Sequence, residues 1–398
     1  MNILMIHQHY FPEMSGTARR TKELAENFAK KGHQVTVLTS YPRDFRSLPG
    51  SGFKKYETIN KVIVYRLKTL FEVRNNVIIR LLSYSTFVIQ SIYYAIVLSK
   101  KSHIIISIAP LSSGIIGAIV HSISRKHHHF DVPDILPDLG VSAGMIKNKI
   151  VIRLLSKLEK WVYNHSTTIS TCTKGQLENI KKKGVASKKM IWIPDWVDSS
   201  SFIFDSNKQS SKLSKKFKGK IIISFIGNIG ALQNPQVFLE TMSLLSNKSQ
   251  IHFLFIGDGI MLSKLKSRVK ELNIENVEFV GRVKREEIPD YMIISDILVA
   301  NYLPDEHLSL YIPGKIFEYA ISQRPIIMGA KGDAEKLISK YKLGISVPPS
   351  DPIAFKEAIL KITSRSFLFK PNVTKFLHDY SIENVIKRYD MVFRKLIK

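Results

Sequence analysis

The sequence predicts an α/β protein made of two doubly wound, parallel-sheet domains. Three observations indicate this fold class. The chain has 398 residues, more than a single hydrophobic core usually organises. Short apolar runs alternate with longer amphipathic segments from the first residue onward, which is typical of parallel strands joined by helices. The alternation restarts near residue 220, after a stretch rich in Ser and Lys, so we expect two domains of near-equal size.

The first half begins with a buried strand in "MNILMIHQHY", which lacks the basic start and the long apolar run of a signal peptide. An amphipathic helix is expected over 17–31, and Gly32 is a suitable residue for its C-terminal end. Further apolar, β-branched runs predict the remaining strands of this domain at 35–39, 103–109, 127–132 and 167–171.

The second half repeats this scheme with the runs "IIISFIGN", "IHFLFIGDG", "VEFVG", "DILVA" and "PIIMG". The expected boundaries are 1–204 for the first domain, 205–219 for a linker, 220–375 for the second domain, and 376–398 for a helix that crosses back to the first. Ligands of doubly wound sheets bind at the carboxyl ends of the strands, so the loops after each strand are the candidate sites.

Charge and cysteine usage narrow the class of protein. Lys and Arg outnumber Asp and Glu by 59 to 33, for a net charge of +26. Nucleic acid, an anionic lipid surface and a solvated Lys-rich surface could each account for this excess. We expect no nucleic-acid partner, because the chain has no recognised binding motif and no aromatic–basic repeat. The single Cys172 excludes an internal disulfide and is consistent with a reducing, cytoplasmic compartment.

The segment 77–98 is long and apolar enough to resemble a membrane span. Arg80 and Gln90 lie inside it, which argues against a spanning helix. We expect a helix packed on the sheet, with a helix that dips into a membrane surface as the open alternative.

Two glycine-containing loops could approach a phosphate. Gly16 precedes the first helix, although a plain structural turn would explain it equally well. The loop "FIGNIGALQN" follows the first strand of the second half and carries Gly227, Asn228 and Gly230. It lacks the third glycine and the distant acidic residue of a dinucleotide site, so a nucleoside diphosphate is the expected ligand.

The stretch "LYIPGKIFEYAISQRPIIMG" at 310–329 combines a helix start with two charges. Pro313 suits a first helical turn, and Gly314 exposes backbone amides to a diphosphate. Lys315 and Glu318 are three residues apart and therefore share a helix face. The carboxylate could accept hydrogen bonds from a ribose diol while the ammonium group neutralises phosphate; the alternative is a surface ion pair.

Three carboxylates follow the strand at 127–132, in "DVPDILPD". Asp131, Asp134 and Asp138 could suggest a divalent metal, but no accompanying ligand pattern supports one. Helix capping or contact with an acceptor is the favoured interpretation, and we expect neither a metal nor a cofactor.

Taken together, these residues resemble the family 4 glycosyltransferases of the GT-B fold, and especially their WbuB-like subgroup of bacterial surface-polysaccharide biosynthesis. The similar segments run through almost the whole chain: "HYFPEMSGTARRTKELAENFAKKGHQVTVLT", "DVPDILPD", "LEKWVYN", "WIPDWVD", "IGDG", "FVGRVKREEIPDYMIISDILV" and "PGKIFEYAISQRPII".

The resemblance implies two Rossmann-like domains facing a central cleft, and a retaining, metal-independent transfer of a sugar from a nucleotide donor, with UDP expected. The sugar implied is an N-acetylated deoxyhexosamine such as N-acetylfucosamine. The acceptor would be carried on a polyprenyl diphosphate, and the enzyme would lie peripherally at the cytoplasmic face of the plasma membrane.

The resemblance also assigns roles to individual residues. Glu318 would hold the donor ribose, and Asp134 would contact the reacting sugars. The remaining donor-binding positions would be Gly16, Gly227, Asn228, Gly230, Gly257, Asp258, Gly259, Arg282, Val283, Pro313, Gly314 and Lys315.

Two features depart from the family pattern. Leu310 stands eight residues before Glu318, where the family often has a second glutamate. Gln233 and Asn234 occupy the region of the phosphate loop that usually supplies a basic residue, so neutralising the diphosphate would fall to Lys315, to glycine-rich amides or to an arginine that the sequence does not identify. A nucleotide-sugar epimerase of the same architecture and a basic nucleic-acid-binding protein are the alternative functions.

Overall fold

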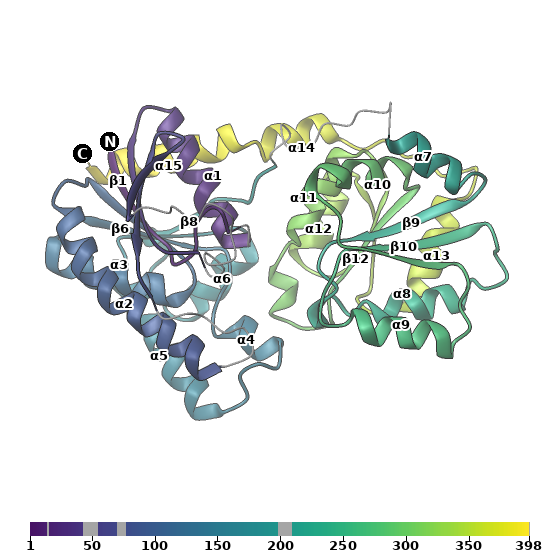
Figure 1. The fold of residues 1–398 in the computed structure, drawn as a ribbon, viewed down its shortest axis with the longest axis horizontal. Helices are drawn as coiled ribbons and strands as arrows, with labels where there is room; N and C mark the ends of the chain where they lie inside the picture. The colour runs from purple at the N-terminus through teal and green to yellow at the C-terminus, as the bar shows by residue number, and fades with distance from the viewer. Residues whose placement is uncertain (14–15, 43–54, 70–76, 198–208, 398) are drawn as a thin grey trace. The chain divides into compact units, whose positions relative to one another are not determined.

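A computed structural model of the chain describes residues 1–13, 16–42, 55–69, 77–197 and 209–397. The chain divides into two compact units (Figure 1). Unit 1 comprises Met1–Pro194 and Glu383–Lys398, and unit 2 comprises Asp195–Ile382. The stretch predicted as a linker contains the helix α7 (Gln209–Lys216), which packs on α10 (Ile288–Ile294) of unit 2. Residues 205–208 of that stretch lie outside the described residues.

Unit 1 contains an eight-stranded sheet in the order β3-β4-β2-β1-β5-β6-β7-β8. Its strands are β1 (Asn2–Ile6), β2 (Gln34–Ser40), β3 (Tyr56–Ile59), β4 (Val62–Leu67), β5 (Ile104–Ile108), β6 (His127–Val132), β7 (Thr168–Thr171) and β8 (Met190–Trp192). All neighbours are parallel except β3 and β4. The strands predicted in this half are confirmed, whereas β3, β4 and β8 were not predicted. The strand order reverses between β1 and β5.

The helices of unit 1 are α1 (Gly16–Lys30), α2 (Val77–Ser99), α3 (Leu111–Ser124), α4 (Asp138–Ser142), α5 (Lys149–Asn164), α6 (Lys174–Lys182) and α15 (Ile382–Ile397), with a short 3-10 turn at Ser187–Lys189. Figure 1 shows α2, α3 and α5 on one face of the sheet and α1 and α15 on the other. Gly32 follows α1 with φ +84°, as expected of a helix-terminating glycine.

Helix α2 is the one described helix that is long and apolar enough to cross a membrane, in its segment Leu82–Ser99. It packs on α3 and on the sheet, and its inward side chains Phe87 and Ala95 are fully buried in the core formed with Leu4 and Ile105. The predicted packing of this helix on the sheet is therefore confirmed. Its outer side leaves several apolar side chains exposed to solvent, namely Leu82, Ile89, Tyr93 and Val97.

A buried ion pair joins α1 to the end of β6. Arg20 donates from Nε to Asp131 Oδ2 at 2.7 Å and from Nη2 to Asp131 Oδ1 at 3.1 Å, and neither side chain is appreciably exposed. Burial alone would raise the pKa of Asp131, but the charge and hydrogen bonds of Arg20 outweigh it and lower that pKa. Ser170 also donates to the carboxylate, at 2.7 Å. Asp131 is therefore a structural anion rather than a solvent-facing one.

Helix α15 completes this part of the core from the far end of the sequence. Tyr389 and Phe393 contact the rings of Phe28 and His129. Arg20 Nη2 also donates to the Tyr389 hydroxyl at 3.3 Å. Helix α15 is thus an integral part of unit 1, although it follows unit 2 in the sequence.

Unit 2 contains a six-stranded, all-parallel sheet in the order β11-β10-β9-β12-β13-β14. Its strands are β9 (Ile221–Ile226), β10 (Ile251–Ile256), β11 (Val277–Gly281), β12 (Ile297–Asn301), β13 (Ile326–Gly329) and β14 (Gly344–Val347). The five predicted runs form β9 to β13, and β14 was not predicted. The strand order reverses between β9 and β12.

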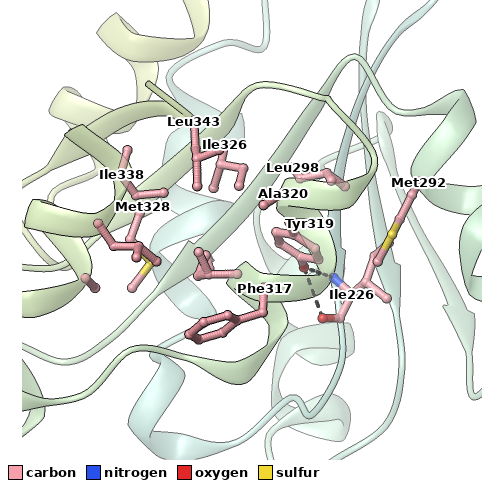
Figure 2. Close-up of a cluster of buried hydrophobic side chains, with 14 of the residues drawn as sticks. Ile226, Met292, Leu298, Phe317, Tyr319, Ala320, Ile326, Met328, Ile338 and Leu343 are labelled. Carbon is pink, nitrogen blue, oxygen red and sulfur yellow. Dashed lines mark hydrogen bonds between the residues drawn. The ribbon is translucent and has the colours of Figure 1, made fainter. Parts of the chain in front are cut away.

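Helices cover both faces of this second sheet. Besides α7 and α10 they are α8 (Gln236–Ser243), α9 (Leu262–Glu271), α11 (Gly314–Ile321), α12 (Asp333–Tyr341), α13 (Pro352–Ile362) and α14 (Val373–Asp379), with 3-10 turns at Ala231–Gln233, Arg285–Glu287 and Leu308–Leu310. One apolar core lies beneath α8, α9 and α13, and a second lies beneath α7, α10, α11, α12 and α14. Figure 2 shows part of this second core.

We predict that Arg20→Met destabilises the protein by about 3–5 kcal/mol, because it leaves the Asp131 carboxylate buried without its counter-ion. Arg19→Met is the matched control. Arg19 is the preceding residue, and its pair with Glu23 at 3.6 Å is partly exposed, so its loss should cost about 0–1 kcal/mol. Urea unfolding of both variants at pH 7 measures the difference. Equal stability of the two variants would contradict the structural role of the buried pair.

Candidate functional site

The carboxyl end of β9 is the centre of the candidate site in unit 2. Strands β9 and β12 pair only through Ile223 and Ser224, and they separate beyond that point. The hydroxyl of Tyr319, on α11, occupies this position (Figure 2). It accepts a hydrogen bond from Ile226 N at 2.8 Å and donates to Ile226 O at 3.0 Å. Helix α11 is therefore fixed to the end of β9, at the point where doubly wound sheets bind ligands.

Lys315 lies one turn before Tyr319 on α11, and its ammonium nitrogen is buried. Nζ has no hydrogen-bond partner in the described structure, although part of the side chain remains accessible. It lies 3.6 Å from the centroid of the Phe225 ring. Burial lowers the pKa of Lys315 to about 7, against a smaller opposing effect of Glu318. A buried cation without an acceptor is costly, and in a ligand-binding loop it indicates an anion site.

Gly227 brings the backbone close to this lysine. A side-chain carbon at Gly227 would lie 3.3 Å from Lys315 Nζ, and the residue has φ +128°, so a larger residue would be strained there. The sequence had predicted this glycine loop and Lys315 as separate candidates. The structure brings them together, and the lysine of α11 lies beside a loop that carries no basic residue of its own.

A second glycine loop, after β10, packs against the first. Ile229 N donates to Asp258 O at 2.9 Å, and Gly257 N donates to Gly281 O at 2.8 Å. A side-chain carbon at Gly257 would lie 2.0 Å from the carbonyl oxygen of Gly227, and one at Gly259 would lie 2.3 Å from that of Ile229. Both glycines are required by this close approach. The sequence motif "IGDG" is explained here by loop packing.

Glu318 faces Arg285 across the unit-2 site. Arg285 Nη2 donates to Glu318 Oε1 at 3.3 Å, and both side chains are partly exposed. Arg285 lies in the turn that follows Arg282 and Val283, of which Arg282 is exposed and Val283 packs on the core. Because Gly281, just before them, accepts the hydrogen bond of Gly257, these residues are close to the second glycine loop.

The first turn of α11 faces the same region of unit 2, where the two glycine loops and Glu318 lie. Pro313 is the N-cap residue and makes no side-chain cap, and Gly314 is exposed with open space around it. The first amides of a helix have no partner within the helix, and they carry partial positive charge. In the glycine loop after β9, Asn228 is exposed, and Gly230 lies against the side chains of Asn228 and Gln233.

The predicted site residues of the first half lie in unit 1. Gly16 begins α1, and Asp134 is partly buried in the loop after β6. Asp138 begins α4, where its carboxylate accepts from Lys183 Nζ at 2.9–3.0 Å. Asp131 is bound to Arg20, so it and Asp138 serve different partners. Within the described ranges, no group of three or more His, Cys, Asp or Glu could hold a metal ion.

Three residues of the unit-2 site were not predicted from the sequence: Phe225, Arg285 and Tyr319. In the sequence, Phe225 and Tyr319 look like ordinary aromatic residues of the core. Only their contacts with Lys315 and Ile226 in the structure distinguish them. The cluster "GRVKREE" offers several basic residues, and the sequence alone does not show which of them faces Glu318.

The fold is that of the glycosyltransferases of the GT-B class. Two family models match the chain: "Glycosyltransferase Family 4" over residues 14–201 and "Glycosyl transferases group 1" over residues 220–365. The chain thus belongs to the glycosyltransferases built from this pair of domains. The subgroup suggested by the resemblance is not distinguished by these matches.

Named relatives and solved structures agree with this class. The chain is 25% identical to the probable glycosyltransferase WbjE of Pseudomonas aeruginosa over 58% of either chain. It is 23% identical to the putative colanic acid biosynthesis glycosyl transferase WcaI of Escherichia coli, over 74% of this chain and 75% of the relative. Alr3699/HepE of Anabaena, solved in complex with UDP and glucose, superposes with a TM-score of 0.74 at 13% identity, covering 99% of this chain and 100% of that one.

We predict that Tyr319→Phe lowers both stability and nucleotide affinity. Ile226 N and O would lose their hydroxyl partner inside the core, at a cost of about 1–3 kcal/mol. The same change would release α11 from the end of β9 and move Lys315 away from Gly227. Urea unfolding and titration with UDP measure the two effects.

Tyr291→Phe is the control, because its hydroxyl makes no hydrogen bond within the described structure and the residue lies on α10 in the same unit. If Tyr319→Phe bound UDP as tightly as Tyr291→Phe, the hydroxyl would not be what positions α11.

Proposed function

We propose that this glycosyltransferase transfers a sugar from a UDP-linked donor to a lipid-linked acceptor during bacterial surface-polysaccharide biosynthesis. The observation that carries the proposal is the buried ammonium nitrogen of Lys315, which lies beside Gly227 without an acceptor. The colanic acid name of WcaI and the UDP complex of the Anabaena structure support the pathway class and the donor class. An N-acetylated deoxyhexosamine such as N-acetylfucosamine is the donor sugar we favour.

In the proposed complex, unit 2 binds the donor. The diphosphate lies against the Gly227–Gly230 loop, the first turn of α11 and Lys315. Glu318 accepts hydrogen bonds from the ribose hydroxyls, and Arg285 orients its carboxylate from the other side. Arg282 and Val283 lie beside the nucleobase. In this proposal the binding groups are held at strand ends and helix starts. Such positions are rigid enough to orient the bond that reacts.

The proposed reaction breaks the bond between the anomeric carbon and the diphosphate oxygen and forms one to an acceptor hydroxyl oxygen. The hydroxyl proton leaves with the diphosphate, and the electron pair of the broken bond stays on its oxygen. Lys315 and the amides of α11 stabilise the charge that grows there, so a metal is not required for this role. The acceptor hydroxyl attacks the anomeric carbon on the face from which the diphosphate leaves, so the configuration at that carbon is retained. Asp134, in unit 1, contacts the reacting sugars.

We predict that the wild-type protein forms product from a panel of UDP-sugars and a polyprenyl-diphosphate-linked sugar with EDTA present. Glu318→Ala should reduce turnover at limiting donor by about 10- to 100-fold, the value of one or two charge-assisted hydrogen bonds. Glu335→Ala, an exposed glutamate on α12, is the control and should be unaffected. Conversion of the donor in the absence of acceptor would instead favour an epimerase.

The lipid-linked acceptor is proposed on the exposed surface of α4 and α5. Between residues 139 and 158 the sequence has four basic residues, Lys147, Lys149, Arg153 and Lys157, and no acidic residue. Met145, Ile150 and Leu154 are 69%, 69% and 61% exposed in the same segment. We call this segment, 139–158, the basic–apolar segment.

The arrangement along α5 fits an anionic bilayer surface. Lys149, Arg153 and Lys157 follow one another at four-residue spacing and so form one row, with Ile150 and Leu154 in the adjacent row. Apolar side chains could enter the headgroup region while the basic row meets lipid phosphates, each basic residue contributing about 1 kcal/mol. The exposed apolar side chains of α2 would add to the same attachment. The anionic lipids at the cytoplasmic face of the plasma membrane would then be the partner for the excess positive charge of the chain.

We predict that the protein floats with vesicles containing phosphatidylglycerol at low salt and not with vesicles of phosphatidylcholine alone. Ile150→Ser combined with Leu154→Ser should reduce the bound fraction by about tenfold or more, because each buried side chain contributes about 1.5–3 kcal/mol. Ile260→Ser combined with Leu368→Ser removes two even more exposed side chains from unit 2 and is the control. Equal binding of both double variants would exclude the basic–apolar segment as the attachment surface.

A further inference from the structure

We propose that, at mildly alkaline pH, Lys315 is a neutral amine before the donor binds and takes up one proton when the donor diphosphate arrives. The inference rests on the proposed function, since it takes the diphosphate of a nucleotide-sugar as the ligand. It adds a property that the proposed function does not contain: donor binding is coupled to the uptake of a proton at one identified atom.

The surroundings of Nζ carry the argument. The nitrogen is buried and has no acceptor within the described structure, and it lies beside the Phe225 ring and Gly227. The face of an aromatic ring attracts a cation, but it cannot accept the three hydrogen bonds that an ammonium group makes in water. Burial without those bonds favours the neutral amine.

No neighbouring charge reverses this balance. From its own helix, Lys315 faces Glu318, whose carboxylate is held by Arg285 at 3.3 Å. Strand β9 and its loop contribute Phe225 and Gly227, which do not titrate. On the loop after β10, Asp258 is exposed and its Oδ1 accepts from Gly259 N at 2.7 Å. Among the residues that the structure describes, Glu318 is the one carboxylate that acts on Lys315, and burial has the larger effect on its pKa.

A diphosphate would change the balance at once, because its oxygens are acceptors and carry the opposite charge. The pKa of Lys315, about 7 before binding, would rise well above its starting value in the complex. The sign follows from linkage: binding is proton-coupled at pH values above about 7, and it becomes independent of pH well below 7. Donor affinity should therefore fall by about tenfold from pH 6 to pH 8, and further at pH 9.

The uptake of a proton by Lys315 on donor binding would also serve the catalytic cycle. Lys315 itself carries no permanent positive charge before binding, so it does not strongly attract other anions of the cell or repel its cations. The ammonium group forms when the diphosphate is in place, and it then faces the oxygen on which charge grows during transfer. Departure of the product diphosphate would return the proton to solvent.

The experiment is calorimetric titration of the full chain with UDP-glucose between pH 6 and pH 9, in pairs of buffers with different ionisation enthalpies. UDP-glucose is the probe because both of its phosphates are esterified, whereas UDP retains a group that titrates near pH 6. The expected result is uptake of about one proton per donor at pH 8–9 and almost none at pH 6.

Three variants make the test specific. Lys315→Met should bind weakly with no proton uptake, and its affinity should approach that of the wild type as pH rises. Lys315→Arg retains its charge throughout, so its binding should not depend on pH over this range. Lys331→Met, an exposed lysine after β13, should behave as the wild type.

The outcomes separate the inference from the function on which it rests. Binding of UDP-glucose with a flat pH profile and no proton uptake would overturn the inference and leave the UDP-sugar donor in place. Proton uptake that persists in Lys315→Met would assign it to another group and also overturn the inference. No binding of UDP-glucose or UDP at any pH would overturn both.

Discussion

The candidate site depends on one hydroxyl group. Tyr319 accepts from Ile226 N and donates to Ile226 O, at a point where β9 has lost β12 as a neighbour. Without a side-chain partner, these two buried backbone groups would be unsatisfied. The need to satisfy them at the strand reversal therefore fixes α11, and with it the position of Lys315 beside Gly227. A comparable arrangement occurs in unit 1, where His7 lies at the reversal between β1 and β5 and contacts Ala109 O at 3.2 Å.

Two buried basic side chains illustrate opposite solutions to the same electrostatic problem. Arg20 is matched by Asp131 with two hydrogen bonds, and the pair serves to join α1, β6 and α15. Lys315 is equally shielded at its nitrogen but has no such partner in the described structure. A protein tolerates an unmatched group of this kind where a ligand supplies the missing interaction, because the stability lost in the free state is recovered on binding. The contrast separates a structural charge from a functional one within a single chain.

The fold was largely predictable from the sequence, because alternating apolar runs and amphipathic segments are a local property of the chain. The strands β3, β4, β8 and β14 were missed, since short edge or near-edge strands carry a weak periodic signal. Pro313 and Gly314 correctly marked the start of α11, for the same local reason. The stretch 205–219, which is rich in Ser and Lys, was read as a linker, yet its residues 209–216 form α7.

The chemistry of the site was predictable only in part. The motifs identified Gly227, Lys315 and Glu318, but not that Lys315 reaches the glycine loop whose own basic residue is absent. That contact depends on how α11 crosses the end of β9, which is set by tertiary packing around Tyr319. The partnership of Arg285 and Glu318 has the same origin. Sequence spacing indicates which residues share a helix face, and it does not indicate which loop that face meets.

The position of α15 has a consequence for how the protein is made. Tyr389 and Phe393 pack against Phe28 and His129, so the core of unit 1 lacks part of its aromatic packing until α15 has left the ribosome. Unit 2 lies entirely between residues 195 and 382 and has all of its sequence available earlier. Although residues 1–194 are synthesised before unit 2, unit 2 can finish folding before unit 1, which reverses the usual N-terminal-first order of multidomain chains.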